Sequence, residues 1–200
     1  MKLFFKLLMA TGLMLNIAIA SAEVTPDALV KQTAEEVLTI VKTDKDIQAG
    51  NQQKIFAIAE EKILPNFDFE RVCRMVLGKN WKSASADQQA AFKKEFRSLL
   101  LRTYASALGK YRDQVIEYKP LRMEPGATNV TVKTQILQSG GQPIAVDYSL
   151  VKANDSWKVY DIVIENVSLV TNYRSQFSNE IRQNGLDSLI KKLADKNAAV

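Results

Sequence analysis

The sequence predicts an α+β fold with a helical N-terminal half, a four-stranded antiparallel sheet and C-terminal helices. Apolar residues recur at three- and four-residue spacing up to about residue 108 and alternate with polar residues from about 115 to 164. Helical spacing returns after residue 168. Helices followed by a run of strands are typical of α+β folds, in which the helices gather on one face of the sheet.

The first segment has the features of a secretory signal peptide. Lys2 and Lys6 flank the start of an apolar run, and the small residues at 20–22 form a cleavage site. The apolar run is too short to span a membrane. We therefore expect a signal peptide over residues 1–22, cleavage after Ala22, export, and a single domain over residues 23–200.

Composition excludes several classes of function. The chain has no histidine, which removes the usual serine and cysteine triads and His-containing zinc sites. Its single cysteine, Cys73, lies in a helical apolar pattern and is expected to be a buried small hydrophobe. Loss of Lys2 and Lys6 with the leader leaves 25 basic and 22 acidic residues, a net charge of +3. So mild a charge argues against dedicated nucleic-acid binding.

Capping residues delimit the helices of the first half. Pro26 follows a capping hydroxyl and opens the first helix, and Pro65 stops the second. Asp68 can cap a third helix that ends at Gly78. Ser85 begins a capping box with Gln88 and opens the longest helix, which runs to about residue 108–111.

Alternation and turn residues define the four strands. The first, over 115–123, contains Pro120, which places that strand at an edge or a bulge. Gly126 and Gly140 mark the next two turns, and short links imply an antiparallel meander. The strands are expected at 115–123, 130–138, 144–150 and 157–164.

The last strand leads directly into a helix. Ser168 is a plausible N-cap, and Leu169, Tyr173, Phe177 and Ile181 follow at four-residue spacing. A strand that is apolar on both faces, joined to an aromatic-striped helix, can enclose an apolar space. The same pattern also suits an ordinary core.

Few residues could support catalysis. Asp161 and Glu165 are four apart near the end of the last strand, where alternation places them on one face. An exported enzyme that uses one of them as a base is therefore one alternative. An assembly factor for membrane proteins or lipoproteins, with an open apolar face, is another.

Two segments resemble the MlaC family, also called the toluene-tolerance proteins. The first is VLGKNWKSA at 76–84, continued by Gln88, Phe92 and Phe96. The second comprises YD at 160–161, VSL at 167–169, NYRSQF at 172–177 and GLDSLI at 185–190. The family commonly has Gly where this chain has Asn166, a residue that tolerates left-handed backbone.

The resemblance implies a periplasmic phospholipid carrier that maintains lipid asymmetry in the Gram-negative outer membrane. Its apolar lipid pocket would lie between the helices and the sheet. It implies phospholipid as cargo, no cofactor, and no enzymatic activity. The implied partners are an inner-membrane ABC transporter complex and an outer-membrane lipoprotein–porin complex. We expect a monomer.

The long helix, the inward strand positions and the last aromatic helix should line this pocket. Exposed cations at its mouth should meet the headgroup, since burying an unpaired phosphate is costly, and here we expect Arg174 and Lys82. The helix from Leu169 to Asn184, moving about the turn at 165–168, is expected to open the pocket; the alternative is that this helix is fixed core and lipid leaves by the strand edge near Pro120. The expected lining residues are Phe96, Leu100, Tyr104, Val132, Val146, Tyr148, Ile162, Ile164, Val170, Tyr173 and Phe177.

Overall fold

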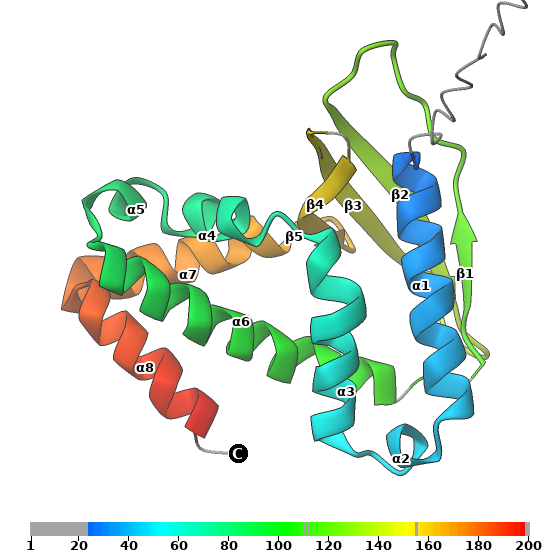
Figure 1. Cartoon of the computed structure of the whole chain (residues 1–200), viewed down its shortest axis with the longest axis horizontal. Helices are drawn as coiled ribbons and strands as arrows, with labels where there is room; N and C mark the ends of the chain where they lie inside the picture. Colours follow the sequence, from blue (N-terminus) through cyan, green and yellow to red (C-terminus); the bar gives the residue numbers. More distant parts are fainter. Residues whose placement is uncertain (1–23, 110, 112, 155, 199–200) are drawn as a thin grey trace, which may run out of the picture.

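The computed structural model describes residues 24–109, 111, 113–154 and 156–198. The expected signal peptide and its cleavage site after Ala22 lie outside these residues. The chain folds as helices, then an antiparallel sheet, then two helices, which confirms the α+β class (Figure 1). Within the described ranges, no helix is both long enough and apolar enough to cross a lipid bilayer.

The helices of the first half begin where the capping residues indicate. Asp68 accepts a hydrogen bond from the backbone N–H of Arg71 at 3.0 Å. Ser85 and Gln88 form the reciprocal bonds of a capping box, at 3.0 and 3.1 Å. The helices are α1 (Pro26–Thr43), α2 (Lys45–Gln48), α3 (Gln52–Ile58), α4 (Phe69–Leu77), α5 (Lys79–Ser83) and α6 (Ala86–Gly109), and a π turn (Ala59–Ile63) and a 3-10 turn (Leu64–Asn66) extend α3.

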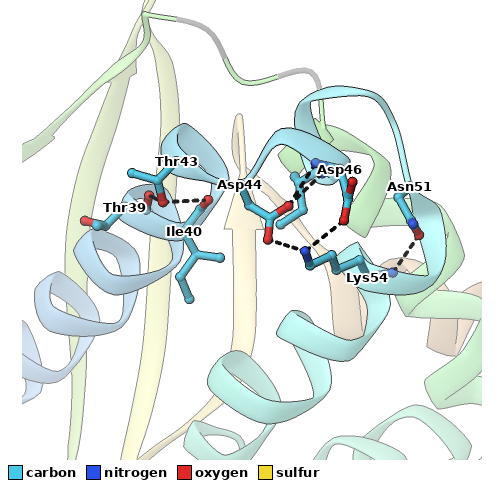
Figure 2. A network of polar contacts seen from close by, with 8 residues as sticks. Thr39, Ile40, Thr43, Asp44, Asp46, Asn51 and Lys54 are labelled. Carbon is cyan, nitrogen blue, oxygen red and sulfur yellow. Dashed lines mark hydrogen bonds and ion pairs between the residues drawn. The ribbon is translucent and has the colours of Figure 1, made fainter.

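The polar stretch between α1 and α3 holds a structured corner. Asp44 caps α2 by accepting from the N–H groups of Asp46 and Ile47 (Figure 2). Lys54 of α3 reaches back to Asp44 at 2.5 Å and to Asp46 at 3.1 Å. The Lys54 ammonium lowers the pKa of Asp44, and the two carboxylates raise the pKa of Lys54. These bonds fix the reversal from α1 to α3.

The sheet has five strands rather than the four expected. All neighbours are antiparallel, in the order β1-β2-β3-β4-β5. The first strand stops before Pro120, which has no N–H to donate. The added strand has two residues, too few to produce a periodic signal. The strands are β1 (Val115–Tyr118), β2 (Asn129–Leu137), β3 (Ile144–Ala153), β4 (Ser156–Ile164) and β5 (Val167–Ser168).

A two-residue hairpin joins β4 to β5. Its central residues, Glu165 and Asn166, have φ values of 48° and 65°. Two successive left-handed residues are the requirement of a type I′ turn, which suits the twist of a hairpin. Asn166 therefore adopts the left-handed backbone that its residue type tolerates.

Two C-terminal helices complete the chain. Ser168 caps α7 (Leu169–Asn184) by accepting from the N–H of Thr171 at 3.0 Å, and Gly185, at φ 84°, separates α7 from α8 (Leu186–Ala198). Helices α4, α5, α7 and α8 gather at one end of the molecule, and α1, α3 and the sheet lie at the other (Figure 1). Helix α6 starts within the first group and ends beside α3. The single long helix thus connects the two ends.

The buried apolar residues form three clusters. They are a helical cluster, a sheet cluster and an N-terminal cluster. Helix α6 contributes to the helical cluster and packs Leu108 against the N-terminal cluster. Helix α1 contributes Val30 to the sheet cluster and Val37 to the N-terminal cluster. The helical cluster comprises Val72, Cys73, Val76, Leu77, Trp81, Phe92, Phe96, Leu99, Val170, Tyr173, Phe177, Leu189 and Leu193. The sheet cluster comprises Val30, Val132, Leu150, Trp157 and Val159. The N-terminal cluster comprises Val37, Val41, Ile47 and Ile55.

Candidate functional site

The eleven expected lining residues fall into two groups rather than one. Phe96, Val170, Tyr173 and Phe177 belong to the helical cluster, and Leu100 and Tyr104 pack against it. The others lie on the sheet: Val132 is in the sheet cluster, Tyr148 and Ile162 pack against it, Val146 is buried and Ile164 is half-buried.

The five sheet residues share one face. Cross-strand pairing places Tyr148 between Val132 and Ile162, and Val146 is paired with Ile164. Directly paired residues project to the same face of a sheet. The alternation in the sequence therefore indicated the correct parity for all three strands, including β4.

This face is incompletely covered. Tyr148, Ile162 and Ile164 are only half-buried, although β3 and β4 are interior strands of the sheet. Three further half-buried isoleucines, at 116, 136 and 144, pair in one row across β1, β2 and β3. These three are not among the expected lining residues, although 136 and 144 lie within the expected strands. Partly exposed apolar side chains gathered on one surface mark a place where another apolar molecule can bind.

The sheet face also carries hydroxyl groups. Thr134 is 2% exposed and donates to the carbonyl oxygen of Val146 at 2.7 Å. Burial raises the pKa of Tyr148 to about 12, and a hydrogen bond with the Thr134 side chain opposes that rise. Because buried hydroxyls are costly unless bonded, the pair keeps polar atoms on an otherwise apolar surface without leaving Thr134 unsatisfied.

The helical group is a compact aromatic core. Phe96 is 1% exposed, and its ring centroid lies 5.1 to 6.0 Å from those of Phe69, Phe92, Tyr173 and Phe177. The rings of Tyr173 and Phe177 meet it edge-on, at 75° and 79°, the arrangement that aromatic quadrupoles favour. Phe96 therefore packs as core.

A cleft opens beside this core, between α6, α7 and α8. Its volume is about 280 Å³, slightly below the roughly 300–1,000 Å³ typical of ligand pockets. Tyr173 and Phe177 are the two expected residues that reach it. Its lining is Leu99, Thr103, Asn172, Tyr173, Gln176, Phe177, Glu180, Leu189, Lys192, Leu193 and Lys196.

The two cations expected near the headgroup lie at one corner of the molecule. The guanidinium of Arg174 sits against Gly78, where an added Cβ would lie 3.3 Å from Nη2. Gly78 connects α4 to α5, and Lys82 is exposed on α5. Neither Arg174 nor Lys82 has an ion-pair partner within the described part of the chain. They remain available to an anion.

The two carboxylates considered for catalysis both bind protein groups. Asp161 accepts from the Ser168 hydroxyl and from the Val170 N–H. Glu165 lies in the hairpin turn and accepts from the N–H of Ala145. The strand ends before Glu165, so the two do not share one strand face as expected. Their bonds are those of a cap and a turn.

Comparisons with known proteins agree with the segments quoted above. A sequence model of the family described as "MlaC protein" matches residues 31–195. The intermembrane phospholipid transport system binding protein MlaC of Haemophilus influenzae is 30% identical over 178 residues, which cover 87% of this chain and 83% of that protein. The toluene tolerance protein ttg2D of Pseudomonas putida is 23% identical over 164 residues, 82% and 76% of the two chains.

A solved structure extends the likeness to the fold. The phospholipid-binding protein from Ralstonia solanacearum, determined in complex with a phospholipid, superposes with a TM-score of 0.81 at 38% identity. The match covers 86% of this chain and 96% of that one. The Haemophilus and Ralstonia proteins are named for binding or transport rather than for an enzymatic reaction. The chain belongs to the MlaC family.

Proposed function

We propose that this protein carries a glycerophospholipid through the periplasm. The observation that carries the proposal is the likeness, over most of both chains, to a protein solved with a phospholipid bound. The half-buried apolar face of β2, β3 and β4 supports it, because that face offers acyl chains a surface that the protein itself leaves partly uncovered. The acyl chains would lie between this face and the helical cluster.

The headgroup would remain outside. Transfer of an unpaired phosphate into an apolar interior is costly, whereas Arg174 and Lys82 offer two exposed cations at the corner between α4 and α5. A carrier that shelters the chains and leaves the headgroup in water should accept several headgroups. Selection of a single headgroup in a competition assay would argue against this placement.

The free energy of lipid exchange between protein and membrane determines whether a carrier can move lipid in one direction without partners. Two acyl chains of about sixteen carbons gain roughly 25 kcal/mol when removed from water, at about 0.8 kcal/mol per methylene. A bilayer provides nearly the same gain, so exchange between protein and membrane is close to neutral. Direction must come from partners, and we propose an inner-membrane ABC transporter complex and an outer-membrane lipoprotein–porin complex as the two docking sites.

An enzymatic role has less support. Asp161 and Glu165 were the candidate bases. Both carboxylates accept hydrogen bonds from backbone or hydroxyl groups in the hairpin and at the start of α7. An assembly factor for membrane proteins or lipoproteins would need an apolar face open to a protein segment. Cargo identity separates these roles.

Native mass spectrometry of the exported protein, purified without added lipid, tests the proposal. A carrier should retain about one phospholipid mass per chain, and lipid extraction should identify a glycerophospholipid. Transfer of that lipid to vesicles should then be measurable. A protein that is folded but free of lipid, and that takes none up from vesicles, would contradict the proposal.

A further inference from the structure

Consecutive residues of β4 contact the segment that leads from α3 into α4, and α4 itself. The Lys158 ammonium donates to the Pro65 carbonyl at 2.6 Å. The carbonyl of Val159 accepts from the N–H of Asp68 at 2.9 Å. The guanidinium of Arg71, on α4, lies over the ring of Tyr160 at 4.3 Å from the ring centroid, a cation–π contact. Strand β4 is therefore the part of the sheet that is attached to the start of the helical end.

An irregularity in β4 makes these contacts possible. The register shifts so that Leu150 pairs with Val159 and Ser149 with Asp161, which leaves Tyr160 as the extra residue of a bulge. A bulge re-aims side chains that a regular strand would send to alternate faces. The adjacent residues Tyr160 and Asp161 can thus both contact helices, Tyr160 on α4 and Asp161 at the start of α7.

Asp161 uses both carboxylate oxygens at the start of α7. Oδ2 accepts from the hydroxyl of Ser168 at 2.6 Å, and Oδ1 accepts from the N–H of Val170 at 3.1 Å. Ser168 in turn accepts from the N–H of Thr171. Bonds to a charged acceptor are stronger than neutral ones, and a negative charge is favourable at a helix N-terminus. The entry to α7 is therefore firmly held.

The hairpin before Ser168 is tied as well. The N–H of Glu165 donates to the Ala145 carbonyl at 3.0 Å, and the N–H of Ala145 donates to the Glu165 carboxylate. These bonds hold Glu165 in a left-handed conformation that a non-glycine residue adopts at a cost. The turn at 165–168, about which the helix is expected to move, is therefore held by backbone and side-chain hydrogen bonds.

We propose that Asp161 and Ser168 are positioning residues that latch the start of α7 to the sheet and thereby set the rate at which lipid leaves. This inference rests on the proposed function. Helix α7 carries Val170, Tyr173 and Phe177 into the helical cluster, and Val170 is also bonded to the latch. Release of the latch frees α7 to rotate away from β4, which widens the space between helices and sheet.

Two substitutions test the latch against a matched control. Asp161→Asn retains an acceptor but removes the charge, and Ser168→Ala removes both the link to Asp161 and the cap of α7. Ser85→Ala removes the cap of α6, which begins beside α5 and away from β4 (Figure 1). All three should bind a fluorescent phospholipid. Since one bond to a charged group is worth about a tenfold change or more in an opening equilibrium, Ser168→Ala should release lipid to vesicles at least roughly tenfold faster, and Asp161→Asn severalfold faster.

Hydrogen exchange provides a readout that does not depend on lipid. The amides of Val170 and Thr171 should exchange faster in both latch variants and unchanged in Ser85→Ala. Unchanged protection at these amides, or equal acceleration of lipid release by Ser85→Ala, would overturn the inference while leaving the carrier role intact. Failure of every variant and of the parent protein to bind lipid would instead overturn the proposed function. Loss of the fold in Ser168→Ala leaves Asp161→Asn as the deciding variant.

Discussion

Replacement of Phe96 by alanine should cause a large loss of stability. The ring is 1% exposed and contacts four other rings at centroid distances of 5.1 to 6.0 Å. Truncation of a buried phenylalanine costs about 3–5 kcal/mol, and the lost aromatic pairs favour the upper part of that range. Because domains of this size lose about 2–4 °C per kcal/mol, the melting temperature should fall by about 6–20 °C.

Urea unfolding of the lipid-free protein measures this loss, and Phe56→Ala is its control. Phe56 is half-buried, packs against the N-terminal cluster and has no ring partner within the described residues. The Phe96 variant should lose clearly more stability than the Phe56 variant, at an unchanged m-value. A loss below about 1 kcal/mol would refute the reasoning, because it would mean that Phe96 lines an open space instead of filling a core.

Three further predictions concern single residues. Gly78→Ala should lower the free energy of unfolding in urea by about 1–3 kcal/mol, because φ is 56°, ψ is −123° and the new Cβ would lie 3.3 Å from Arg174. The control Gly126→Ala, whose Cβ meets nothing within 4 Å, should lower it less. Equal losses would contradict the contact with Arg174. Burial raises the pKa of the Cys73 thiol to about 12, so a thiol reagent at pH 8 should label the unfolded chain and leave the native one unlabelled; rapid native labelling would show that Cys73 is accessible. The pKa of Tyr148 is raised to about 12 from an ordinary value of about 10. The contribution of this group to stability should be complete below pH 10 and lost as pH rises toward 12, and Tyr148→Phe should reduce that loss. An equal loss in the parent and in Tyr148→Phe would show that the hydroxyl is exposed.

Local signals in the sequence determined much of the fold. The capping box at Ser85 and the cap at Asp68 located two helices, because a cap depends on residues close in the chain. Strand parity followed from alternation, since Val132 and Val146 could be assigned to the inward face without knowledge of their partners. Strand β5 was missed because two residues carry no period.

Tertiary partners could not be predicted in the same way. Periodicity indicated that Phe96 and Ile162 would be buried, but not that they would pack in separate clusters. The bulge at Tyr160 depends on the register against β3, which no single strand reveals. Asp161 was a candidate base in the sequence because its partners, Ser168 and Val170, come from the following hairpin and helix.

The most direct test of the account is to ask which face of the sheet touches lipid. Ile162 and Val163 are adjacent, both are half-buried, and they point to opposite faces of β4. A photoreactive aliphatic amino acid at each position, irradiated in protein purified with its native lipid, should yield a phospholipid adduct at 162 and little or none at 163. Equal labelling at both positions, or none at 162 in a protein that retains lipid, would contradict a lipid site on this face.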